Sequence, residues 1–164
     1  MFYLDLFAAL DRHKVDYLLI GGLALNIYGV ERATMDIDLM IAFDRTNVLR
    51  FIGAAEELEM TPVVPVRLDE LADADKRRTW IEDRHMLAFA LHSHDAGKPT
   101  VDILIAPAID FAAAFSRRVV KQVGILPICL AAIDDLLILK HQAGRKQDLA
   151  DIEALQRLRS LGRA

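Results

Sequence analysis

Short apolar runs alternate with segments of helical periodicity along the whole chain. Leu4, Phe7, Ala8 and Val15 recur near one helical face, which predicts a first helix over residues 2–15. Short runs rich in apolar and β-branched residues predict strands at residues 16–20, 36–43, 86–92 and 100–106, and two more within 119–130, separated by Gly124. The remaining helices are predicted at residues 23–29, 44–60, 108–118, 131–143 and 146–162.

The order of these elements predicts the fold class. Strands are mixed with helices early in the chain, whereas residues 131–162 contain helices only, so we expect an α/β (α+β) fold: a mixed β-sheet flanked by helices, with a helical C-terminal part. The strands at 86–92 and 100–106 predict an antiparallel hairpin. We expect a single domain over residues 1–164, with the sheet core at about 1–129 and the C-terminal helices at about 130–162.

Capping residues mark several of the predicted helix ends. Gly29 predicts the end of the second helix, and Asp44 or Thr46 is suited to cap the helix that follows. Asp148 is suited to cap the last helix. Residues 61–85 contain prolines followed by many charges and are hard to assign as a whole. The charged part around Trp80 is interpreted as a charged helix face with one docked tryptophan, and contact of its basic residues with nucleic acid is the alternative.

Composition narrows the class of protein. The chain is 54% hydrophobic and 27% charged over 164 residues, which is typical of a globular domain, and its net charge of -4 provides no overall field that would attract nucleic acid. Cys129 is the only cysteine, so an internal disulfide is excluded. The first residues lack the basic region of a signal peptide, and the apolar runs are too short to span a bilayer. We therefore expect a soluble cytoplasmic protein without a membrane contact.

Two acids interrupt the apolar run at residues 36–43. Asp36 and Asp38 are two residues apart, so in a strand their carboxylates project from the same face. Like charges at this range repel and need compensation, for which Mg²⁺ (or Mn²⁺) is suited because it prefers oxygen ligands. The alternative is a strand end at the surface, with both acids in water.

A glycine pair precedes these acids at a predicted strand–helix junction. Gly21 and Gly22 allow close approach of the backbone to a ligand, and the N-terminus of the following helix offers free N–H groups to a phosphate. Asp102 lies alone among apolar residues of a later predicted strand, which suggests a third metal ligand. A phosphate cradle beside paired carboxylates is the combination that nucleotidyl transfer requires.

These residues resemble the signature of the nucleotidyltransferase superfamily typified by DNA polymerase beta. Gly21, Gly22, Asp36, Asp38 and Asp102 match its glycine pair, Asp-x-Asp and third acid in order. The resemblance implies that the three aspartates are catalytic metal ligands and that the glycines contact phosphate. One departure is Leu23, because the superfamily often has a serine there that touches phosphate.

A more specific resemblance is to the toxin-related nucleotidyltransferases of AbiE-type abortive-infection systems (AbiEii-like). The string Arg32, Thr34, Asp36, Ile37, Asp38 and Leu39 fits their typical motif, and "LKHQAGRKQDLADIEAL" resembles their C-terminal segment. The resemblance implies that Arg32, Thr34 and Lys140 contact nucleotide or phosphate. Alternatives are a solvated Arg32 and a Lys140 placed by the helix dipole or paired with Asp151. Arg145 and Lys146 are interpreted as a solvated turn, with contact to the substrate as the alternative.

The expected function is metal-dependent transfer of a nucleoside monophosphate from a nucleoside triphosphate to an acceptor. The sequence does not choose between tRNA, a protein and a small molecule as acceptor. A toxin-like role with an antitoxin partner is one version, and a homodimer is another arrangement that would complete a minimal core. The alternative function is a non-catalytic nucleotide- or partner-binding module that keeps the fold, which Leu23 motivates.

Overall fold

The computed structural model describes residues 2–162. Its strands are β1 (Tyr17–Ile20), β2 (Ile37–Ile41), β3 (Met60–Pro62), β4 (Ala88–Ser93), β5 (Val101–Leu104), β6 (Val119–Val123) and β7 (Leu126–Leu130). Its helices are α1 (Phe2–Arg12), α2 (Gly21–Tyr28), α3 (Arg45–Glu57), the 3-10 helix η1 (Leu68–Ala72), α4 (Ala74–Arg84), α5 (Phe111–Ser116), α6 (Ile133–Ala143) and α7 (Lys146–Ser160). None of these helices is long and apolar enough to cross a membrane.

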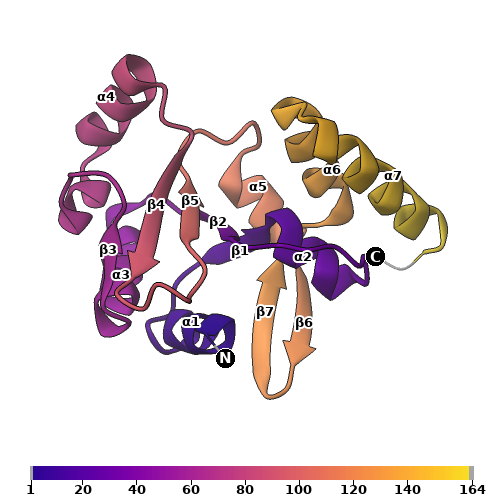
Figure 1. The fold of residues 1–164 in the computed structure, drawn as a ribbon, viewed down its shortest axis with the longest axis horizontal. Coiled ribbons are helices and arrows are strands. Elements are labelled where there is room, and N and C mark those ends of the chain that lie inside the picture. Colours follow the sequence, from indigo (N-terminus) through magenta and orange to yellow (C-terminus); the bar gives the residue numbers. More distant parts are fainter. Residues whose placement is uncertain (1, 163–164) are drawn as a thin grey trace.

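The strands form one mixed sheet in the order β3-β4-β5-β2-β1-β7-β6, which confirms the predicted fold class. The central strand β2 pairs antiparallel with β1 and parallel with β5. The predicted hairpin of β4 and β5 is confirmed as an antiparallel pair. The β6–β7 hairpin is also antiparallel and extends away from the body of the molecule (Figure 1).

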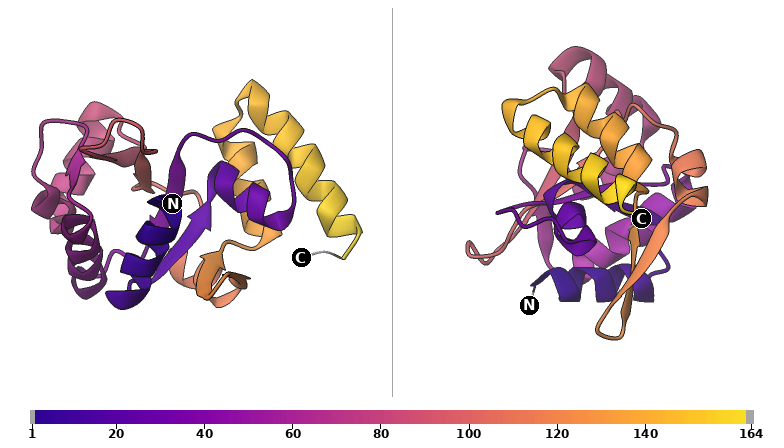
Figure 2. Two further views of the ribbon diagram at one scale, coloured as in Figure 1. Left: turned by 60° about the horizontal axis from the view of Figure 1, so that its bottom comes forward. Right: turned by 90° about the vertical axis from the view of Figure 1, so that its right-hand side faces the viewer.

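The core lies between the sheet and the helices that cover it. All four residues of β1 are buried, as expected for a central strand with both faces covered. Phe7 of α1 stacks on Tyr17 of β1, with ring centroids 5.8 Å apart. Helices α6 and α7 run side by side at the end of the molecule opposite α4 (Figures 1 and 2).

Helix ends follow the predicted caps, with one correction at the end of the first helix. Asp44 caps α3 by accepting a 3.0 Å hydrogen bond from the Asn47 backbone N–H, and Gly29 ends α2 with a φ of 101°. The Asp148 carboxylate accepts from the Arg145 backbone N–H at 2.9 Å, as its predicted cap role requires. The first helix, however, ends at Arg12. Lys14 has a left-handed φ of 57°, and a right-handed α-helix cannot continue through such a residue.

Residues 61–85 do contain secondary structure, namely part of β3, then η1 and α4. Helix α4 begins where Asp73 accepts hydrogen bonds from the backbone N–H groups of Asp75 and Lys76. Its one buried side chain, Trp80, stacks on Phe89 of β4 at 5.3 Å. A single large apolar anchor therefore holds a helix whose sequence is otherwise charged.

Candidate active site

The glycine pair lies at the start of α2, where β1 ends without an intervening turn. Gly21 has a φ of +68°, and a Cβ atom there would lie 2.0 Å from Oδ2 of Asp38. A Cβ atom on Gly22 would lie 2.7 Å from Oγ1 of Thr34 and 3.2 Å from Nε of Arg32. Any side chain at these two positions would therefore collide with three of the predicted site residues, so the glycines permit this close approach.

The three predicted acids come from two neighbouring strands. Asp38 of β2 is in direct register with Asp102 of β5. Asp36 lies just before β2, and its Oδ1 accepts a 2.8 Å hydrogen bond from Oγ1 of Thr100. Since β2 begins at Ile37, Thr34 belongs to the preceding loop and donates from Oγ1 to the Asp36 carbonyl oxygen at 3.2 Å.

The acids repel one another in a partly buried setting. Burial, and then the charges of Asp102 and Asp36, raise the pKa of Asp38 to about 6, although Lys140 and Arg145 act in the opposite direction. Burial and the charge of Asp36 also raise the pKa of Asp102. Oδ1 of Asp102 is buried without a hydrogen-bond partner. The cluster therefore carries negative charge that the surrounding protein does not neutralise.

The donor chemistry of this cluster fits a hard divalent cation. Carboxylate oxygens are the ligands that Mg²⁺ prefers, and an unpaired buried oxygen is the feature that a cation would compensate. In residues 2–162, however, no three His, Cys, Asp or Glu side chains are arranged as a ready group of metal ligands. The acids thus suit a metal chemically, while the side-chain positions seen here do not form a complete ligand set.

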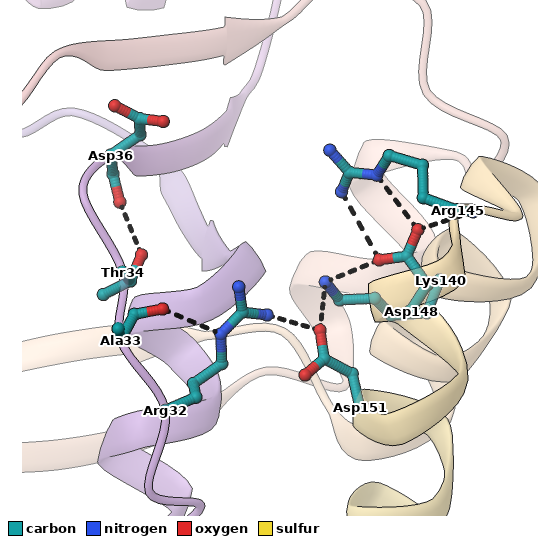
Figure 3. A network of polar contacts seen from close by, with 8 residues as sticks. All are labelled: Arg32, Ala33, Thr34, Asp36, Lys140, Arg145, Asp148 and Asp151. Atoms are coloured by element: carbon teal, nitrogen blue, oxygen red, sulfur yellow. Dashed lines mark hydrogen bonds and ion pairs between the residues drawn. The ribbon is translucent and has the colours of Figure 1, made fainter.

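Arg32 connects the loop before β2 to the last helix. Its guanidinium forms an ion pair with Asp151 of α7, and its Nε donates to the carbonyl oxygen of Ala33 at 3.3 Å (Figure 3). Because Arg32 also lies against Gly22, this side chain sits at the N-terminus of α2. A fork of donors at a helix N-terminus is a chemically suitable place for a phosphate.

Lys140 is buried, and its amino group faces two carboxylates of α7. Its Nζ is 3.0 Å from Oδ1 of Asp148 and 2.8 Å from Oδ2 of Asp151, and the residue is 6% exposed. The pairing with Asp151, one of the alternatives considered from the sequence, is thus confirmed. The ammonium group is already occupied by two carboxylates.

Arg145 contacts the same buried carboxylate as Lys140, although it is not among the predicted site residues. It was interpreted as part of a solvated turn, and its side chain is indeed 62% exposed. Its Nε nevertheless binds Oδ2 of Asp148 at 3.0 Å, and its charge lowers the pKa of Asp38. The only local signal was its position three residues before Asp148, the spacing of a capping interaction.

A cavity of about 550 Å³ is lined in part by the loop that carries Arg32. Arg32, Thr34 and Asp36 line it, but Asp38 and Asp102 do not. The other lining residues are mostly apolar and include Tyr3, Phe7, Leu23, Asn26, Ile27 and Ile128. Leu23, where the superfamily often has serine, therefore faces this cavity, as does Asn26, whose Oδ1 is buried without a partner.

Solved structures with a similar fold are nucleotidyltransferases. The crystal structure of ANT(2")-Ia in complex with adenylyl-2"-tobramycin matches with a TM-score of 0.61 at 15% identity, over 98% of this chain and 87% of that chain. The lincomycin-bound crystal structure of the lincosamide antibiotic adenylyltransferase LnuA matches with a TM-score of 0.55 at 18% identity, over 94% and 93%. A putative nucleotidyltransferase from Thermotoga maritima matches with a TM-score of 0.51 at 15% identity, over 95% and 87%. These matches establish the fold.

Comparison with curated proteins gave no sequence match. A family model described as a nucleotidyltransferase of unknown function (DUF6036) matches residues 2–161, which is nearly the whole chain. The chain therefore belongs to the DUF6036 family of nucleotidyltransferases.

Proposed function

We propose that this protein transfers a nucleoside monophosphate from a nucleoside triphosphate to an acceptor hydroxyl and releases pyrophosphate. The observation that carries the proposal is the register of Asp38 with Asp102 directly beside the Gly21–Gly22 start of α2. It combines a cluster of unneutralised carboxylates with an anion-binding helix end, and phosphoryl transfer depends on both.

Asp36, Asp38 and Asp102 are the residues proposed to hold Mg²⁺ or Mn²⁺, after small side-chain movements bring their oxygens together. A bound divalent ion would neutralise the triphosphate and favour the deprotonated acceptor oxygen. Asp102 is also proposed to help take up the proton of the acceptor hydroxyl. The backbone of Gly21 and Gly22 and the guanidinium of Arg32 would bind phosphate oxygens, and Thr34 holds the loop in place through Asp36.

The acceptor is proposed by analogy alone. Two of the three structural neighbours were solved with an antibiotic or its adenylylated product, lincomycin in LnuA and adenylyl-2"-tobramycin in ANT(2")-Ia, which makes ATP and a small hydroxylated acceptor the first pair to test. The AbiE-like string from Arg32 to Leu39 motivates tRNA or a protein as the second class of acceptor, with an antitoxin partner. A single domain, a cytoplasmic location and a homodimer stay predictions.

Calorimetric titration of ATP, GTP, CTP and UTP with and without Mg²⁺ tests the proposal. Wild-type protein should bind at least one triphosphate in a Mg²⁺-dependent manner, and Asp36→Ala/Asp38→Ala should lose that binding. Asp134→Ala is the matched control, because Asp134 forms an exposed ion pair with Arg159. Absence of Mg²⁺-dependent binding by the wild type would refute the proposed function.

Binding without turnover would instead favour the non-catalytic module. To separate the two, α-³²P-labelled triphosphates are incubated with the protein and panels of aminoglycosides, lincosamides, tRNA and protein. Label transferred by the wild type but not by Asp38→Asn supports an enzyme. Mg²⁺-dependent binding with no labelled product from any panel supports the module.

A further inference from the structure

Helix α7 carries two buried carboxylates one turn apart. Asp148 is 0% exposed and Asp151 is 6% exposed. The Nζ atom of Lys140 lies between them, at 3.0 and 2.8 Å. Because Lys140 is itself buried in α6, this triad fixes the position of both carboxylates relative to the helix pair.

Each carboxylate also holds one arginine. Asp151 pairs with Arg32, which precedes it by 119 residues, and Asp148 pairs with Arg145 through Nε at 3.0 Å. The two arginines come from different parts of the chain, the loop before β2 and the turn between α6 and α7. Figure 3 shows their side chains on either side of the Lys140 amino group, in the region between Asp36 and α7.

Arg32 lies at the helix start proposed to receive the triphosphate, where its Nε is 3.2 Å from the place that a Cβ atom of Gly22 would occupy. Arg145 is connected to Arg32 through shared ion pairs, because Lys140 contacts both Asp148 and Asp151. Arg145 is also largely exposed, so most of its donors remain open to a ligand.

The charges of the three basic and two acidic residues in these ion pairs do not sum to zero. Arg32, Lys140 and Arg145 contribute three positive charges, and Asp148 and Asp151 contribute two negative charges, which leaves one positive charge beside Asp36, Asp38 and Asp102. Buried ion pairs add little net stability compared with apolar packing, so helix docking alone does not require so many charges. A planar guanidinium held from behind by a carboxylate is well suited to bind phosphate oxygens.

We propose that Arg32 and Arg145 together bind the phosphates of the nucleoside triphosphate, and that Asp148, Asp151 and Lys140 are positioning residues that hold the two arginines. This inference rests on the proposed function and adds Arg145 and α7 to the site. It also gives Lys140 a role behind the arginines in place of direct phosphate contact.

The test compares ATP with AMP, both titrated with Mg²⁺ by calorimetry. Arg145→Ala is the main variant, because an exposed side chain can be truncated without emptying the core. Arg145→Ala should weaken ATP binding about tenfold or more, as expected for a lost charge-assisted hydrogen bond, and AMP binding by less than about threefold. Arg145→Lys should restore only part of the loss, because lysine lacks the fork of donors. Arg159→Ala, about 20 Å further along α7, is the matched control and should change neither.

The positioning role has a separate readout. Arg32→Ala, Asp151→Asn and the double variant form a cycle in which the double variant should bind ATP no more weakly than Arg32→Ala. A thermal melt of each variant separates loss of fold from loss of binding. If Asp151→Asn melts earlier but keeps its affinity for ATP, Asp151 only fastens the helices and the positioning claim is wrong.

The possible failures are distinguishable. Wild-type protein that binds ATP, together with an Arg145→Ala variant whose ratio of ATP to AMP affinity is unchanged, refutes this inference and leaves the proposed function intact. Wild-type protein that binds no triphosphate with Mg²⁺ refutes the proposed function, and this inference with it.

Discussion

Asp38 of β2 and Asp102 of β5 lie opposite each other in a parallel strand pair, in direct register. Asp36 is the residue directly before β2. The strand pairing holds these carboxylates together although their charges repel, and burial adds to the cost. The protein therefore keeps a local source of instability at the place where the chemistry is proposed. A proton or a cation can relieve it, and both effects are measurable.

The pH dependence of stability should report on Asp38. Its pKa is raised in the folded state to about 6 from 3.8, so the folded protein keeps a proton that the unfolded chain releases. Between about pH 4 and 6 the Asp38 contribution to stability therefore falls as pH rises. In metal-free buffer, the melting temperature of Asp38→Asn should therefore increase relative to that of the wild type as the pH rises through this range. A constant difference between the two proteins would contradict the raised pKa.

Mg²⁺ should stabilise the wild type and not the variant Asp102→Asn. The cation would compensate Oδ1 of Asp102 and the neighbouring charges, and a ligand that binds only the folded state raises its melting temperature. Without metal, Asp102→Asn should melt above the wild type, because one repulsive charge is removed. Differential scanning fluorimetry with and without millimolar Mg²⁺ measures both effects, and an equal Mg²⁺ shift in both proteins would argue against a site at Asp102.

Gly21→Ala should be more damaging than a glycine substitution at a similar backbone angle elsewhere. The new Cβ atom would lie 2.0 Å from Oδ2 of Asp38, in addition to the strain of a positive φ. Gly124→Ala is the control, because Gly124 has a φ of +64° and open space around it, so only the backbone strain of about 1 kcal/mol applies. Urea unfolding should show a clearly larger loss for Gly21→Ala. Equal losses would mean that Asp38 moves aside at little cost.

Leu23→Ser should not improve triphosphate binding, although the superfamily often has serine there. Leu23 packs against the core and lines the cavity beside Phe7, so a hydroxyl at this position would face apolar side chains. The substitution should lower the free energy of unfolding by about 2 kcal/mol through lost apolar burial. Calorimetry and urea unfolding on the same samples measure the two effects, and a gain in ATP affinity would show that residue 23 reaches the phosphates.

Lys140→Met should destabilise the fold. The change removes the cation between two buried carboxylates, but Asp148 keeps Arg145 and Asp151 keeps Arg32 as partners, so the loss should stay below about 3–5 kcal/mol, which is typical of a buried charge left without a partner. Adding Asp148→Asn and Asp151→Asn to Lys140→Met removes the repulsion and should recover much of the loss. Urea unfolding of the two proteins checks this, and a failure of the triple variant to regain stability would place the cost in packing.

The sequence was most informative where the relevant contacts are local. The caps at Asp44 and Asp148 follow from spacings of three residues. The prediction that Asp36 and Asp38 share a strand face is met only in part, because β2 begins at Ile37 and Asp36 precedes it. The pairing of β2 with β5 could not be predicted, because no local pattern relates Asp38 to a strand that begins at Val101. Arg145 was not among the predicted site residues for the same reason, since Asp38, whose pKa its charge lowers, is far away in sequence.

The segment over residues 61–85 shows the other limit of the sequence. The interpretation of the charged stretch as a helix face with one docked tryptophan is confirmed by α4 and the buried Trp80. Its bounds and its packing partner Phe89 could not be predicted, because one apolar residue sets no period. The first helix was predicted too long because Leu4, Phe7 and Val15 fit one face. The break at Lys14 depends on a backbone angle that apolar spacing does not report.

The ion pair between Arg32 and Asp151 has a consequence for protein synthesis. A ribosome translates the loop that carries Arg32 long before it reaches Asp151, 119 residues later. A nascent chain can fold β1, α2 and β2 early, yet it has no partner for Arg32 until α7 emerges. A prematurely terminated chain that retains all three acids and the glycine pair would lack Asp151 and with it the anchored arginine. On this proposal, phosphate binding requires that translation has passed α7.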